Sequence, residues 1–152
     1  MNPGLERLFA EFRLAGADML PVRLAFGLEC VKHVEHLMED PRAVDCLRAF
    51  EAALGHGDHD GVAVAALQDE AARLAQSHPG SRSIDGTGHA SVSATHALMH
   101  AVAGRALQAA DYAAYAAVYS YGGYAVKDPA AFEPEFEWQQ ACLRRLCSAR
   151  QH

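Results

Sequence analysis

Three features of this 152-residue sequence predict an all-α fold, a single-domain bundle of about six or seven helices. Alanine is very abundant, and alanine is the strongest helix former. Apolar residues recur at three- and four-residue spacing, which is the period of an amphipathic helix. Prolines and glycines fall at intervals that would separate such helices. The sequence shows no internal repeat and no sign of a second domain, so we predict one helical domain over residues 1–152.

The first half of the chain predicts four helices. Pro3 and Pro21 fall in the first turns of two of them, where a missing N–H costs little. Asp40 is a good N-cap and Pro41 suits the first helical position after it. Glycines after residue 54 stop the third helix. The expected ranges are about 2–16, 18–38, 41–54 and 58–76.

The second half predicts three more helices after a Gly-, Ser- and Pro-rich loop at residues 77–88. Asp111 is expected to cap the second of these three helices, which the Gly122-Gly123 pair weakens near its end. Asp128-Pro129 marks the last break. The expected ranges are about 88–109, 111–121 and 133–148.

Charge and composition exclude some classes of protein. The net charge of −6 with no basic patch argues against a nucleic-acid binder, and suits solubility or a basic partner. No segment approaches eighteen consecutive apolar residues, so we expect no membrane span. The first thirty residues lack a signal-peptide pattern, which favours a cytoplasmic protein. Reduced, partly buried thiols are therefore expected at Cys30, Cys46, Cys142 and Cys147.

The histidines supply the main candidate for chemistry. His89, His96 and His100 lie within about 40° of one another on a helix, and the last two have the i, i+4 spacing that lets imidazoles share a metal. His89 is roughly 10 Å too far along the axis to join them. A third ligand would have to come from another helix, and the HExxH pattern is missing. Packing or hydrogen bonding is the simpler role, with a metal-dependent enzyme or metal sensor as the alternative.

Other ligand-type residues have simpler explanations. His56 to Asp60 could form a surface metal clip, but Asp58 and Asp60 also suit helix caps. Asp85 to Gly88 lacks the lysine and the preceding strand of a phosphate loop. Glu29 and His33 do not form the Glu-x-x-His motif of a di-iron bundle. No catalytic residue and no cofactor is predicted.

Tyrosines provide a candidate binding face. Tyr112, Tyr115 and Tyr119 share one side of a helix, where they could pack in the core or contact a partner, since tyrosine is enriched at interfaces. Glu35 and Glu39 are the acidic candidates for the same role. Trp138, the only tryptophan, is expected to be a buried structural anchor of the last helix.

The order of several motifs resembles the immunity proteins of bacterial polymorphic toxin systems, specifically the immunity-5-like helical domain. The likeness runs from about Cys30 to Leu146 and departs at Tyr119 to Tyr124. Three stretches carry it: Asp40-Pro41-Arg42 with the helix to Phe50-Glu51-Ala52; Ala94-Thr95-His96 with His100-Ala101-Val102 and Ala106-Leu107 up to Ala113; and Asp128-Pro129-Ala130 with Glu135-Phe136-Glu137-Trp138-Gln139 and Leu143.

The resemblance implies a cytoplasmic binding protein that neutralises a cognate toxin by occluding its active site. Such a role needs a complementary surface and no catalysis, so the expectation is that the chain is not an enzyme. The metal-dependent enzyme or sensor built on His96 and His100 is the rival. A homodimeric structural module is the third alternative.

Overall fold

The computed structural model describes residues 1–57, 62–77 and 86–150, and over these ranges the chain forms seven α-helices and no strand. The predicted all-α class is therefore confirmed. The same described ranges contain four short 3₁₀ segments: η1 (Ala17–Met19), η2 (Glu35–Leu37), η4 (Gly123–Lys127) and η5 (Pro129–Phe132). The α-helices are α1 (Pro3–Glu11), α2 (Leu20–His33), α3 (Pro41–Gly55), α4 (Val62–Ser77), α5 (Gly86–Val102), α6 (Ala106–Tyr119) and α7 (Glu133–Arg150).

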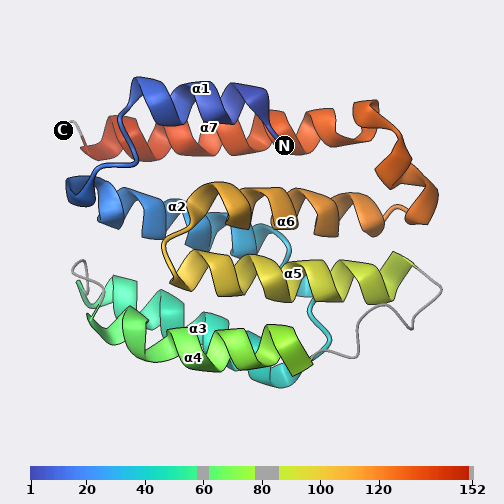
Figure 1. Cartoon of the computed structure of the whole chain (residues 1–152), viewed down its shortest axis with the longest axis horizontal. Coiled ribbons are helices and arrows are strands. Elements are labelled where there is room, and N and C mark those ends of the chain that lie inside the picture. The colour runs from blue at the N-terminus through green and yellow to red at the C-terminus, as the bar shows by residue number, and fades with distance from the viewer. Residues whose placement is uncertain (58–61, 78–85, 151–152) are drawn as a thin grey trace.

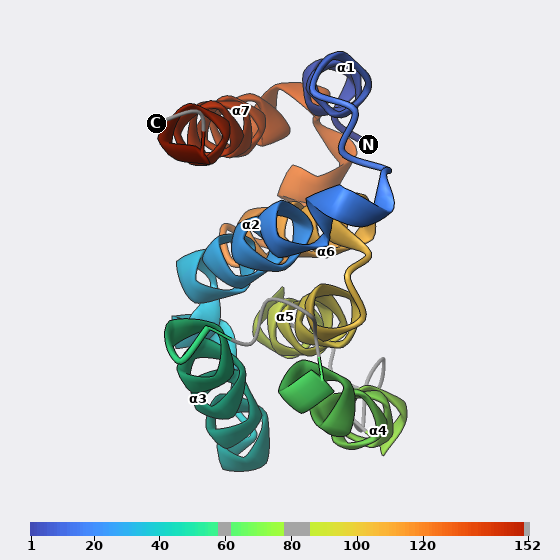
Figure 2. The ribbon, with the colours of Figure 1, turned by 90° about the vertical axis from the view of Figure 1, so that its left-hand side faces the viewer.

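The helices stack in successive layers (Figure 1). The two ends of the chain meet in one layer, where α1 lies along α7. The next layer holds α2 and α6, followed by α5, and the antiparallel pair α3 and α4 closes the far side (Figure 2). Because α2 and α6 both contact α5 and α7, they form the centre of the bundle.

Small residues form the seam on which the central helices meet. Alanines occupy the buried side of α5 and α6 almost throughout, which allows their backbones to approach closely. At Gly27 of α2 an added Cβ would lie 3.0 Å from the Cβ of Ala101, so only glycine fits this crossing without displacing α5. With alanine on the inner side, the larger His and Tyr side chains of α5 and α6 are left for the outside. The buried alanines of the seam are Ala90, Ala94, Ala97, Ala101, Ala106, Ala109, Ala110, Ala113, Ala114, Ala116 and Ala117.

The predicted break between the fifth and sixth helices is wrong by several residues. One helix was expected to reach residue 109, but α5 ends at Val102, and Asp111 lies inside α6 instead of capping it. Gly104 adopts φ +75° there. The Arg105 N–H donates to the His100 carbonyl and the Gly104 N–H to that of Ala101, the two bonds of a Schellman motif.

The second helix is also shorter than predicted. Instead of continuing to residue 38, α2 ends at His33 and the chain tightens into η2, with the Leu37 N–H donating to the Val34 carbonyl. This turn brings the Glu35 carboxylate to 2.6 Å from Arg48 of α3. The proposed caps Asp58 and Asp60, and Asp85 of the suggested phosphate loop, lie outside the described residues.

The structure also bears on the expected state of the cysteine thiols and on the expected lack of a membrane span. Cys30, Cys46, Cys142 and Cys147 are free thiols and are all buried, which is deeper than predicted. Burial, with a smaller contribution from Glu70, raises the pKa of Cys46 to about 11, so this thiol is a poor nucleophile. In the described ranges no helix has the length and apolar character needed to cross a bilayer.

Candidate binding surface

The outer side of α5 and α6 carries a run of stacked imidazole and phenol rings, here called the His–Tyr face. It consists of His89, His96 and His100 of α5 and Tyr112, Tyr115 and Tyr119 of α6. The alanine seam creates it, because two helices in close contact bring the side chains that flank the seam within stacking distance. The predicted grouping of these residues into two stripes is correct. That the stripes face each other could not be read from either helix alone.

Ring geometry shows how the two stripes fit together. Tyr112 stacks on both His96 and His100, with ring centroids 5.2 Å apart in each case and interplanar angles of 21° and 13°. His89 stacks on Tyr119 at 5.1 Å. Stacked rings of this kind have few rotamers left to lose, so the face is preorganised for contact with another molecule.

The same geometry bears on the metal alternative. The Nδ1 atom of His100 accepts a hydrogen bond of 2.9 Å from Arg105 Nε, so only its Nε2 atom remains as a potential ligand. A guanidinium group at this distance also repels a cation. Among the described residues, no cluster of three His, Cys, Asp or Glu side chains is placed to hold a metal. Within the described ranges, the His96 and His100 pair therefore finds no third ligand of the kind that this alternative requires.

We predict that His100 makes the stability of the protein dependent on pH. Burial, followed by the charges of Arg105 and His96, lowers the pKa of His100 to about 4. Its unfolded pKa is about 6.5, so its stabilising contribution is complete above that value and is lost as the pH falls towards 4. After a discount for solvent screening of a partly exposed ring, we expect a loss of roughly 1–2 kcal/mol. Urea unfolding at pH 6.5 and pH 4.5 of the wild type and His100→Gln measures it; equal pH dependence in the two proteins would refute the assignment.

Exposed aromatic area continues beyond the face along the chain. Tyr112 and Tyr115 are 37% and 38% exposed, and in the turn after α6 Tyr121 and Tyr124 are 56% and 78% exposed. The described ranges contain six exposed large hydrophobic side chains, and four of them are these tyrosines. Tyr115 also borders a hollow of about 220 Å³ that it shares with Met1, Val126, Pro129, Phe132 and Phe136. Tyr112 and Tyr115 thus give the His–Tyr face exposed phenol area, and Tyr121 and Tyr124 expose further aromatic area in the turn after α6.

The acidic candidates lie elsewhere. The Glu39 N–H donates to Ser91 Oγ at 3.1 Å, and Ser91 lies about 160° around α5 from His89. The Glu35 carboxylate is held by Arg48, whose guanidinium also contacts Glu51. The Glu39 side chain is exposed, whereas the charge of Glu35 is already paired. The structure therefore does not join these two residues to the His–Tyr face.

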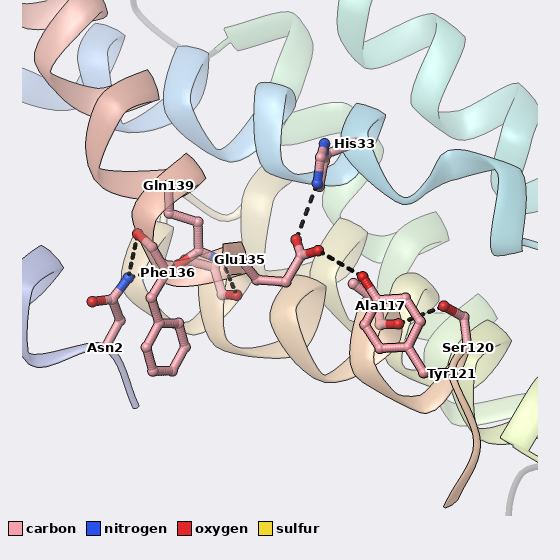
Figure 3. Close-up of polar contacts among 9 residues, drawn as sticks. Asn2, His33, Ala117, Ser120, Tyr121, Glu135, Phe136 and Gln139 are labelled. Carbon is pink, nitrogen blue, oxygen red and sulfur yellow. Dashed lines mark hydrogen bonds and ion pairs between the residues drawn. The ribbon is translucent and has the colours of Figure 1, made fainter. Parts of the chain in front are cut away.

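A second polar cluster, absent from the sequence-based candidates, holds the turn after α6 against α2 and α7 (Figure 3). The buried Glu135 of α7 accepts a hydrogen bond from His33 Nε2 at 3.0 Å and another from the Tyr121 hydroxyl at 3.3 Å. The Trp138 ring stacks on His33 with centroids 3.8 Å apart. Because both carboxylate oxygens are engaged and one face of the imidazole is covered, the cluster is suited to fixing the turn and unsuited to acid–base catalysis.

Trp138 itself differs from its predicted state. It packs against the core but is only partly buried, and its stacking partner is His33. The fully buried polar residue of α7 is its neighbour Gln139, which is 2% exposed. Gln139 Nε2 donates to the Ala110 carbonyl of α6 at 2.8 Å, and its Oε1 accepts from Asn2 Nδ2 at 3.1 Å (Figure 3).

No protein-family model, no curated protein and no solved structure matches this chain. The surface must therefore be interpreted from its own geometry.

Proposed function

We propose that this chain is a binding protein that neutralises a partner protein by covering part of its surface, with the His–Tyr face as the contact. The observation that carries the proposal is the pair of exposed tyrosines, Tyr112 and Tyr115, on a face of stacked rings in which Tyr112 lies against His96 and His100. Tyrosine gives large contact area at a low entropic cost and is enriched at the centres of interfaces. From the resemblance in sequence, the partner would be a bacterial toxin encountered in the cytoplasm.

Charge supports the proposal in a second way. The His–Tyr face itself contains no acidic residue, and His100 is neutral at pH 7 because its pKa is about 4. The Arg105 guanidinium is bonded to His100 at this face, and interface centres are depleted of acidic residues and lysine but enriched in arginine. The net charge of −6 resides elsewhere on the molecule, where it would speed association with a basic partner without being desolvated in the contact.

The experiment uses the protein encoded by the gene adjacent to this one, measuring its affinity by calorimetry and its toxicity in co-expressing cells. We expect Tyr112→Ala and Tyr115→Ala each to weaken binding about tenfold, as central aromatic contacts do, and to reduce protection. Arg73→Ala on α4 is the matched control, since Arg73 is exposed and pairs only with Glu70. Wild-type affinity in both tyrosine variants would reject the face. Stoichiometric metal that is lost in the His96→Ala, His100→Ala double variant would favour the metal alternative.

A further inference from the structure

A groove of about 420 Å³ lies between α2, α3 and α7, the three helices on one side of the bundle (Figure 2). None of its lining residues belongs to the His–Tyr face. Its floor is apolar and is formed chiefly by Val22, Ala25, Leu28, Leu54 and Leu146. The groove follows α2 from Pro21 to Lys32, a length of about 16 Å at the rise of an α-helix. The volume lies within the range of small-molecule sites, whereas a stable protein contact buries roughly 800 Å² on each partner.

The charged residues of the groove wall differ in whether another protein group already pairs with or hydrogen-bonds to them. Lys32 is paired with Glu51 at 2.6 Å. Arg150 donates to the backbone carbonyl of Asp18 at 3.2 Å. Glu29, half-buried in the same wall, makes no ion pair or hydrogen bond with any residue that the structure describes. Arg150 also makes no ion pair with a described residue, but it is exposed to solvent, so Glu29 is the half-buried charge of the groove that has no partner there.

The negative charge of Glu29 acts on residues of both α7 and α2. Burial raises the pKa of Cys142 on α7 and the hydrogen bond to Glu51 raises that of Lys32, and the negative charge of Glu29 adds a smaller contribution to both. Leu146, which lines the groove, lies one turn after Cys142. Because Glu29 and Leu146 both line the groove, a ligand on its apolar floor would meet the Glu29 side chain.

We propose that this groove binds a small amphiphilic cation, with an apolar body on the floor and an ammonium group against Glu29. An anionic head would have to displace Glu51 from Lys32 and would meet Glu29 as a like charge, whereas a pair with the exposed Arg150 would be screened by water. A neutral ligand would take water from the Glu29 carboxylate and return no partner to it. A cationic head satisfies Glu29 and leaves the Lys32–Glu51 pair intact. This site is separate from the proposed partner-binding face.

The test compares three probes that share an octyl chain: octyltrimethylammonium, octyl sulfate and octanol, each below its micellar concentration. We expect octyltrimethylammonium to bind with one site per chain, at least tenfold more tightly than octyl sulfate, in calorimetric or NMR titrations. Glu29→Gln should weaken the cation about tenfold, towards the affinity of octanol. Glu6→Gln is the matched control, because Glu6 is exposed on α1 and its removal changes the net charge equally.

A second variant locates the bound probe. Gly55 is the last residue of α3 and lines the groove, and a Cβ added there would have no atom within 4 Å. Gly55→Leu should therefore fold normally, checked by circular dichroism, while its side chain occupies groove space and abolishes binding of both the cation and octanol. Three results would each overturn the proposal: no saturable binding of the cation, equal affinity for octyl sulfate, or full binding to Gly55→Leu. A Gly55→Leu variant that impaired only the partner protein would also overturn it, by assigning the groove to a protein contact.

Discussion

Glu135→Ala is expected to lower the free energy of unfolding by about 3 kcal/mol. The buried Glu135 carboxylate accepts hydrogen bonds from His33 of α2 and from Tyr121 in the turn after α6. A hydrogen bond to a charged group contributes about 1.5–3 kcal/mol, and the 3.3 Å bond to Tyr121 belongs at the low end of that range. Equilibrium denaturation measures the loss. Since Tyr121 precedes the exposed Tyr124, the variant should also reduce affinity for a partner that contacts this turn.

Glu133→Ala is the control that separates the contribution of the Glu135 hydrogen bonds from that of a negative charge near the helix dipole. Glu133 and Glu135 both lie in the first turn of α7, where a negative charge stabilises the helix by about 0.3–1 kcal/mol. Only Glu135 is buried and bonded to His33 and Tyr121. The difference between the two variants therefore reports the cluster alone. Equal losses would show that the contacts of Glu135 contribute nothing beyond its position in α7.

Helix starts were predictable where one side chain satisfies a local N–H group. Asn2 accepts from the Leu5 N–H, Asp40 from that of Arg42 and Asp128 from that of Ala130, each over two or three residues of sequence. Such caps depend on neighbours along the chain, so the sequence contains all that is needed to identify them. Asp128-Pro129 marks a break as predicted, where Asp128 caps the short η5, and α7 begins at the predicted Glu133.

Helix ends inside alanine-rich sequence were harder to predict. Gly104 carries the signal for the end of α5, but alanine and leucine continue the helical pattern on both sides of it. Asp111 then looked like a cap only because it is an isolated acid in that stretch. Its actual neighbour is the amino group of Met1, 3.7 Å away. The end of α5 is set locally at Gly104 and is masked by the alanine-rich pattern, whereas the neighbour of Asp111 is set by tertiary contact, about which the apolar period contains no information.

The candidate surface was predictable in its parts and not in its assembly. The spacing of His96 and His100 correctly placed them on one face, but their contact is Tyr112 on the next helix. Glu135 and His33 are separated by 102 positions, so no local pattern could join them. The groove beside Glu29 was missed for the same reason, since its walls come from three helices. The Trp138-Gln139 pair stood out in the sequence, yet the more buried member is Gln139.

Gln139→Ala is expected to cost about 3 kcal/mol of unfolding free energy. Gln139 is almost fully buried, donates to the Ala110 carbonyl and accepts from Asn2 Nδ2, so it connects α7 to α6 and to the start of α1. Each neutral hydrogen bond contributes about 1 kcal/mol, and its loss leaves a buried group with less solvation than it had in water. The removed amide also leaves a cavity, which adds a further loss. Thermal and denaturant unfolding should both record the change.

Gln140→Ala is the matched control for this prediction. Gln140 is the next residue of α7, is half-buried, and makes one hydrogen bond, from its Nε2 to Asn2 Oδ1 at 3.1 Å. Its removal deletes the same amide from the same helix, but it leaves the Ala110 carbonyl bonded to Gln139 and opens no internal cavity. We expect this variant to lose about 1 kcal/mol or less. If the two variants lost equal stability, the buried position of Gln139 would contribute nothing, and the junction of α1, α6 and α7 would depend on apolar packing around Leu143 and Leu5 instead.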